Sequence, residues 1–118
     1  MKRILKLAAL LAAVLLVFAA CSKGADADSA PFHIGVVTGS VSQSEDDLRG
    51  AEELIKLYGD SKTGGMITHL TYPDNFMDQM DTTISQILSL ADDAKLKAII
   101  VNQAVPGTAE AFKRVREK

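Results

Sequence analysis

The stretch that decides the fold is HIGVVTGSVSQSEDDLRGAEELIKLYG, residues 33–59. It begins with a short β-branched run, His33–Thr38, which predicts a strand. Apolar residues then recur at intervals of three and four, which predicts an amphipathic helix. Ser44, with Asp47 three residues later, is typical of a helix start, and Gly59 is typical of a helix end. The stretch therefore predicts a strand, a polar loop and a helix in succession.

The same alternation continues to the end of the chain. Met66–Tyr72 predicts a second strand near a sheet edge, because its apolar residues alternate with polar ones. Lys97–Asn102 is a continuous apolar run, which predicts a third strand covered on both faces. Helices are expected over 76–92 and from Thr108. The order predicts an α/β fold: a three-layer, Rossmann-like β-α-β-α-β-α unit with a parallel sheet and right-handed crossovers.

The predicted helix over 76–92 has its apolar residues on one face, which should be buried against the sheet. These residues are Met77, Met80, Ile84, Ile87, Leu88 and Ala91. The residues from about Thr108 onward are expected to form a last helix with Phe112 and Val115 on its buried side. The chain stops where a further strand should follow, so we expect it to be the first part of a longer protein.

The first twenty residues, MKRILKLAALLAAVLLVFAA, have the pattern of an export signal. A positively charged start precedes an apolar run of roughly 14 residues and then small residues. The run is short for a bilayer span, which needs about 20 apolar residues. A signal anchor or a buried helix is the alternative. The next residue is Cys21, and FAAC resembles the lipobox of bacterial lipoproteins, although Phe18 stands where leucine is usual. That resemblance implies lipidation of Cys21 and anchoring to a membrane.

Residues 21–31 are small and polar, which predicts a flexible tether between the membrane and the folded domain. Cys21 is the only cysteine, so no disulfide can form within the chain. The structural alternative for Cys21 is a buried free thiol. Residues 1–20 hold three positive charges and no acid, so their removal takes the formal charge from −2 to −5. An acidic domain is poorly suited to phosphate backbones, and nucleic acid is therefore not an expected partner.

Catalytic and cofactor signatures are missing from the sequence. It has no phosphate-binding loop with its lysine, no Gly-x-Gly-x-x-Gly after the first strand and no nucleophile elbow. His33 and His69 lack the spacing of a metal pair, and ordinary structural roles are favoured for both. The acids of 45–47 complement the helix dipole without any acid–base chemistry. We therefore expect no enzyme, no cofactor and no metal.

Ligands of open parallel α/β sheets bind outside the carboxyl ends of the strands. Here those ends lead into the polar loops TGSVSQSE, YPDNF and NQAVPGT, each followed by a helix N-terminus. The expected ligand-binding residues are Thr38, Ser40, Ser42, Tyr72, Asp74, Asn102 and Gln103. Structural alternatives remain open: Ser44 and Thr108 as helix caps, Asp74 with Asn75 as a cap of the second helix, and Tyr72 packed under a loop.

The residues quoted from 32–59, together with THLTYPDNFMDQMDTTISQILSLADDAKLKAIIVNQAVPGTAEAF (68–112), resemble an uncharacterised family of bacterial lipoproteins. That family is similar to type I periplasmic binding proteins near the basic-membrane-protein group, and TYPDNF and NQAVPGT carry the resemblance most specifically. It implies an extracytoplasmic, lipid-anchored protein that binds a small polar solute and delivers it to an ABC permease. Such proteins close two lobes over the solute, whereas residues 32–118 cover only part of the first lobe.

Three alternatives to transport stay open. The chain could be a membrane-anchored sensor or interaction lobe that signals to a receptor, or an incomplete gene fragment without function. An extracytoplasmic α/β enzyme is the least favoured, because no nucleophile is paired with a base. The residues do not identify the solute, although the absence of lysine and arginine from the three loops disfavours a highly charged anion.

Overall fold

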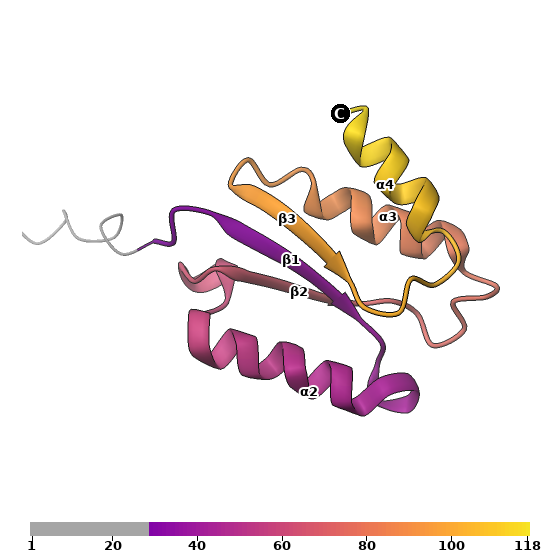
Figure 1. Ribbon diagram of the computed structural model, residues 1–118, viewed down its shortest axis with the longest axis horizontal. Coiled ribbons are helices and arrows are strands. Elements are labelled where there is room, and N and C mark those ends of the chain that lie inside the picture. The colour runs from indigo at the N-terminus through magenta and orange to yellow at the C-terminus, as the bar shows by residue number, and fades with distance from the viewer. Residues whose placement is uncertain (1–28) are drawn as a thin grey trace, which may run out of the picture.

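The computed structural model describes residues 29–118, so the expected signal peptide, Cys21 and most of the tether lie outside the described residues. Three parallel strands form one sheet in the order β2-β1-β3 (Figure 1). The elements are β1 His33–Thr38, α2 Val41–Tyr58, the short 3₁₀ turn η2 Ser61–Thr63, β2 Ile67–Thr71, α3 Met80–Leu90, β3 Leu96–Val101 and α4 Thr108–Arg116. The predicted Rossmann-like α/β fold with a parallel sheet is confirmed.

The central strand β1 divides the core into two layers of side chains. Val36 faces α2 and packs with Ala51 and Ile67, whereas Val37 faces the opposite side and packs with Ile87 of α3. Helix α2 therefore covers one face of the sheet, and α3 with α4 covers the other (Figure 1). Successive residues of a strand point to opposite faces, so one buried strand supplies both layers. Among residues 29–118, no helix is long and apolar enough to span a bilayer.

The boundaries of the first strand and helix follow the sequence closely. Strand β1 has the predicted bounds. Ser44 departs from helical geometry at φ −157° and ψ 81°, so a short turn over 41–43 precedes the main helix. The Ser44 hydroxyl donates to the Asp47 carboxylate over 2.5 Å, at the predicted start of that helix. Gly59, at φ 77°, ends the helix and donates its backbone N–H to Ile55, which confirms the predicted stop.

The predicted start of the second helix is wrong. Helix α3 begins at Met80 rather than at residue 76, because the carbonyl of Asn75 accepts the N–H groups of Asp78 and Gln79 and closes a local turn. Met77 is consequently 69 % exposed and Met80 46 % exposed, although both were expected on the buried face. The buried residues of the helix are Thr83, Ile84, Ile87 and Leu90. Proline-rich and Asx-containing loops commonly form such turns in place of a first helical turn.

The sequence left Thr108 open as a cap of the last helix, and this alternative is wrong. Gly107, at φ 93°, occupies the N-cap position, and Thr108 is the first helical residue with a buried hydroxyl that has no partner in the described part of the chain. Asp74 and Asn75 do not cap α3 either, since Gln79 precedes it. The caps were therefore predicted a residue or more away from their places.

The third strand is not covered on both faces, contrary to expectation. β3 lies at one edge of the sheet and pairs with β1 alone among the described strands. On the α2 side its Ile100 is 53 % exposed, because α2 packs on β1 and β2. β2 lies at the other edge, as predicted. A continuous apolar run indicates that a strand can be buried on both faces. Whether it is buried depends on which other elements of the fold pack against it.

Candidate functional site

The loops after β1 and β2 meet at the carboxyl end of the sheet (Figure 1). Ser40, directly after β1, donates its hydroxyl to the carboxylate of Asp74, which follows β2. The Ser42 hydroxyl lies 2.8 Å from that of Ser40. Gln43 donates its side-chain amide to the backbone carbonyl of Asp74. Two loops that are more than thirty residues apart in sequence are thus joined by side-chain hydrogen bonds.

The loop after β3 reaches the same place through Gln103. Its amide nitrogen lies 3.2 Å from the Asp47 carboxylate, to which it donates, and its Oε1 accepts from the Tyr72 hydroxyl over 3.3 Å. Gln103 has φ 54°, the one positive φ of a non-glycine residue in the described part of the chain. A non-glycine residue in this region is strained, and such strain gathers at functional sites. We call this group of exposed and half-buried side chains the polar rim: Ser40, Ser42, Gln43, Asp47, Asp74, Asn102 and Gln103.

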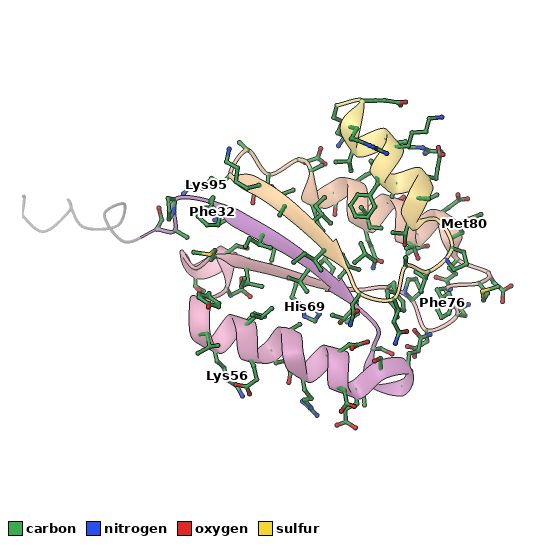
Figure 2. All side chains as sticks on the ribbon, in the orientation of Figure 1. Phe32, Lys56, His69, Phe76, Met80 and Lys95 are labelled. Carbon is green, nitrogen blue, oxygen red and sulfur yellow. The ribbon has the colours of Figure 1, made fainter. Side chains whose placement is uncertain are left out.

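Two of the predicted ligand residues lie beneath the polar rim. Thr38 is 2 % exposed, and its hydroxyl donates to the carbonyl of Gly39 and lies 2.9 Å from Nε2 of His69. Because Thr38 has a single hydroxyl proton, the His69 ring donates in this contact. Figure 2 shows His69 between the sheet and α2. Tyr72 is 1 % exposed and packs edge-to-face on Phe76, with 5.6 Å between the two ring centroids. Only its hydroxyl therefore reaches the rim.

Asn102 belongs to the α2 side of the polar rim. Its backbone N–H donates to Val37, which extends the pairing of β1 and β3 by one residue. Its side chain lines a hollow of about 300 Å³ between β3 and the first turns of α2. The other lining residues are Val36, Thr38, Asp46, Asp47, Gly50, Ala51, Leu54 and Ile100. The hollow thus joins an apolar floor to a polar mouth.

The rim carries negative charge. Hydrogen bonds from Ser40 and then Ser42 hold the pKa of the Asp74 carboxyl below its usual range, so Asp74 is ionised at neutral pH. Burial, and secondarily the charge of Asp47, raises the pKa of the Tyr72 hydroxyl, which stays a neutral donor. The loops 39–47, 72–79 and 102–108 contain no lysine or arginine. Hydroxyls, amides and carboxylates in this arrangement can hydrogen-bond a neutral polar molecule or bind an ammonium group.

Sequence reasoning missed Gln43 and Asp47 as members of the rim. Asp47 was assigned to the helix dipole, although its carboxylate also receives Gln103. Gln43 lies between Ser42 and Ser44 in the polar loop after β1, and that position was the one signal in the sequence that could have marked it as a rim residue. Its Oε1 is buried without a partner among residues 29–118. The described residues contain no group of three histidine, cysteine, aspartate or glutamate side chains placed to hold a metal ion.

The two histidines have structural contacts. His33 lies at the opposite end of the sheet from the rim, with its Nδ1 2.5 Å from the Asp93 carboxylate. That hydrogen bond, and secondarily the backbone N–H of Lys95, lowers the pKa of Asp93. Burial lowers the pKa of His69, and the nearby charge of Glu52 partly offsets this. Neither imidazole lies free in a cleft.

Comparisons with known proteins place the chain among longer relatives. An uncharacterized protein of Treponema pallidum (strain Nichols) is 43 % identical over 89 residues, which are 74 % of this chain and 40 % of that protein. A solved structure described as a "Putative transcriptional regulator from Clostridium difficile 630" aligns with a TM-score of 0.64 and 32 % identity. That alignment covers 73 % of this chain and 26 % of the solved chain. The chain thus spans less than half the length of either relative.

A family match covers nearly all of the described fold. Residues 32–118, from the residue before β1 to two residues past α4, match one family. This range includes every residue of the polar rim. The chain therefore belongs to the family described as "Protein of unknown function (DUF3798)".

Proposed function

We propose that this chain is the solute-binding lobe of an extracytoplasmic lipoprotein, anchored through Cys21, and that the polar rim binds a small neutral or cationic solute for delivery to an ABC permease. The observation that carries the proposal is the meeting of three loops at one end of the sheet, where Ser40 contacts Asp74 and Gln103 contacts Asp47. Parallel α/β sheets bind ligands at this end.

The chemistry of the rim supports this solute class. Ionised Asp74, with its orientation held by Ser40, offers an acceptor to an ammonium or hydroxyl group. Asn102 and Gln103 offer amides that can both donate and accept. Val41, at the start of α2, and Met77, in the loop after β2, are 56 % and 69 % exposed and supply apolar surface beside these groups. A pocket with a few converging polar groups and apolar surroundings is typical of small-molecule sites.

The rim forms one wall of a binding site. Its hollow is open to solvent, and the chain spans only 40 % of its Treponema pallidum relative. Tight binding needs most of the ligand surface to be buried. Weak binding, in the millimolar range, is therefore expected from this chain, corresponding to about −4 kcal/mol.

Amide chemical shifts of the full chain in detergent micelles test the proposal, because this measurement detects millimolar binding. The probes are putrescine, adenosine and glucose, with inorganic phosphate as the anionic contrast. We expect at least one of the first three to shift amides within 39–47, 72–78 and 102–107. Asp74→Asn should weaken these shifts, whereas Asp78→Asn, an exposed aspartate of the same turn, should leave them unchanged. Shifts with phosphate alone, or shifts confined to the His33 end, would contradict the proposal.

The membrane anchor has its own test. Cells that express the chain should incorporate labelled palmitate into it, and Cys21→Ser should abolish the label. Incorporation that survives the substitution would remove Cys21 from the proposal while leaving the solute site untouched.

A second candidate function is solute sensing. It is favoured by the Clostridium difficile structure, whose description as a regulator concerns that protein alone. The same rim would then report a solute to a signalling partner. Genes for a permease and an ATPase next to this gene favour transport, and a kinase gene favours sensing.

A further inference from the structure

The chain enters the described fold at the end of the sheet opposite the polar rim (Figure 1). The backbone N–H of Ala30 donates over 2.8 Å to the carbonyl of Gly64, in the turn before β2. The Lys95 ammonium, just before β3, donates to the Ser29 hydroxyl over 3.2 Å and to the Ala30 carbonyl over 3.4 Å. Contacts with the segments before both edge strands therefore hold residues 29–30 at this end.

This end of the sheet stays close to the proposed membrane anchor. Cys21 and Ser29 are eight residues apart. A fully extended chain spans at most about 3.6 Å per residue, so Ser29 lies within about 29 Å of the lipidated residue. Such a short tether gives an effective concentration in about the millimolar range, so even a weak contact with the bilayer is populated. The inference rests on the lipidation of Cys21 in the proposed function.

Two large apolar side chains are exposed at this same end, in the last turn of α2. Leu57 is 72 % exposed and Tyr58 is 52 % exposed. The Tyr58 carbonyl accepts the N–H of Met66 over 2.9 Å, which fixes the end of α2 beside the start of β2. Tyrosine is enriched at the membrane–water interface, because its ring is apolar and its hydroxyl stays hydrated. These side chains therefore suit insertion among lipid headgroups.

Exposed lysines flank this apolar surface. We call the base the surface formed by Lys56, Leu57, Tyr58, Lys62 and Lys95. Figure 2 shows Lys56 and Lys95 at the end of the molecule where the tether begins. Within residues 29–118, neither Lys62 nor Lys95 forms an ion pair. Lysines in this position attract the phosphates of anionic lipids.

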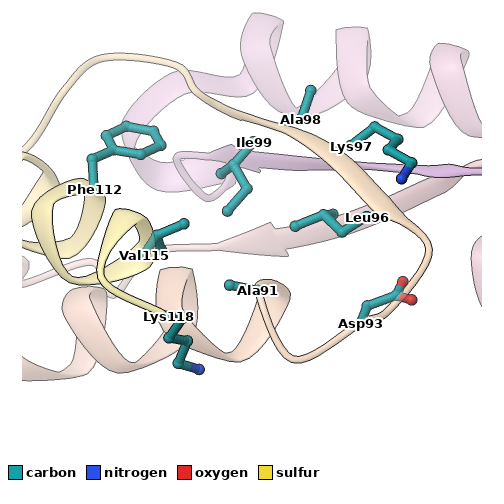
Figure 3. Close-up of a pocket in the computed structure, with 9 residues that line it drawn as sticks. All are labelled: Ala91, Asp93, Leu96, Lys97, Ala98, Ile99, Phe112, Val115 and Lys118. Atoms are coloured by element: carbon teal, nitrogen blue, oxygen red, sulfur yellow. The ribbon is translucent and has the colours of Figure 1, made fainter.

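The carboxylates nearest to the base are engaged within the domain. The contacts are Glu53 with Lys56, Asp60 with the backbone N–H of Lys62, Asp92 with Lys118, and Asp93 with His33. Figure 3 shows Lys118 beside the end of α3 and Asp93 in the loop that follows. The charged groups of the base that are free to reach a lipid phosphate are therefore the ammonium groups of Lys62 and Lys95.

The opposite end of the sheet is acidic. Carboxylates gather in the rim loops and in the first turns of the helices that follow them: Glu45, Asp46, Asp47, Asp74, Asp78, Asp81 and Glu110. The six residues of β1 separate the two ends by about 20 Å. This is more than twice the Debye length of about 8 Å at physiological ionic strength, so a bilayer in contact with the base is screened from the acids of the rim. The charge asymmetry favours an orientation with the base toward anionic lipid and the rim away from it.

We propose that the base docks on the surface of the bilayer that holds the anchor, with its apolar side chains among the headgroups and its lysines on the phosphates of anionic lipids. The docked chain presents the rim to the surrounding solution, where it can collect solute. The contact is reversible, which leaves the tether free to turn the rim toward a permease.

The test uses the full lipidated chain in nanodiscs that contain a gadolinium-chelating lipid, which broadens the amide signals of residues near the bilayer. In nanodiscs of phosphatidylcholine with phosphatidylglycerol, we expect the amides of 56–64 and 94–96 to broaden more than those of 40–47 and 102–107. In phosphatidylcholine alone, or at high salt, this difference should shrink, because the lysines lose their anionic partners or are screened from them.

Variants separate the base from the rest of the surface. Lys62→Glu should lower the ratio of docked to undocked chain by about fivefold or more, since it removes a lysine from the contact with anionic lipid. Lys113→Glu is the matched control, because Lys113 is exposed on α4 and lies outside the base. Leu57→Ser should also weaken docking, whereas Ile100→Ser, at a residue 53 % exposed outside the base, should not. Circular dichroism of the four variants establishes that they fold, as expected for exposed positions.

Three results would overturn the inference alone and leave the anchor and the solute site in place. One is equal broadening of the base and the rim, which indicates a chain that moves freely on its tether. Another is broadening of the base that is as strong without anionic lipid. The third is an equal effect of the base variants and their matched controls. A chain that carries no labelled palmitate on Cys21 would instead overturn the anchor and this inference together.

Discussion

Replacement of Gln103 by glycine and by alanine measures the cost of the left-handed backbone conformation in the loop after β3. Both variants lose the hydrogen bonds to Tyr72 and Asp47, which span 3.3 and 3.2 Å. They differ at the backbone, where φ is 54°. Alanine in the left-handed region costs about 1–2 kcal/mol, and glycine avoids that cost. Glycine loses about 0.5–1 kcal/mol more conformational entropy on folding. Q103G should therefore be more stable than Q103A by about 0.5–1 kcal/mol.

Urea unfolding of the full chain, followed by circular dichroism, resolves such a difference through the transition midpoint. Asn102 supplies the matched control, because it is the preceding residue and its φ is not positive. There the order should reverse, with N102G less stable than N102A by about 0.5–1 kcal/mol. Equal stability of Q103A and Q103G, or the same order at both positions, would refute the left-handed backbone conformation of Gln103.

Two further predictions concern the fold beneath the rim. Burial lowers the pKa of His69 in the folded chain below the ordinary histidine value of about 6.5. The unfolded chain therefore binds more protons than the folded chain as the pH falls below about 6.5, and stability decreases. His69→Gln, which keeps a neutral donor for Thr38, should flatten this decrease in unfolding experiments, and an equally steep decrease would contradict the assignment. Gly65→Ala places a methyl group 2.1 Å from the carbonyl carbon of Gly59 and should cost at least about 3 kcal/mol. Gly50→Ala, with nothing within 4 Å inside α2, should instead add about 0.5–1 kcal/mol, and similar effects of the two changes would refute the close approach of Gly59 and Gly65.

Much of the fold could be predicted from local patterns. The β-branched run of β1 has the predicted bounds, and Gly59 ends α2 as expected, because strand propensity and the left-handed C-terminal glycine are local properties. The start of α3 could not be predicted from its apolar spacing. Met77 fits the apolar spacing of the helix, yet residues 75–79 form a turn closed by the Asn75 carbonyl instead of a first helical turn. Periodicity alone cannot show which of two local hydrogen-bond patterns forms.

The candidate site was predicted in part. Ser40, Ser42, Asp74, Asn102 and Gln103 lie together on the rim, as expected from parallel strands whose carboxyl ends share one edge. Gln43 and Asp47 join them through contacts between loops, which no spacing in the sequence indicates. Whether these residues bind a solute remains the prediction that the chemical-shift experiment addresses.

The sequence by itself determined the alternation of strands and helices, the polar character of the three loops and their lack of cations. Each of these properties depends only on residues that are close together in the sequence. Only the tertiary structure decided that β1 is central, that Thr38 and Tyr72 lie under the rim, and that β3 leaves Ile100 exposed at an open edge. Strand order and burial depend on which distant segments pack together. The free energy of that packing depends on both of the surfaces that come into contact, so it cannot be worked out from the sequence of either segment alone.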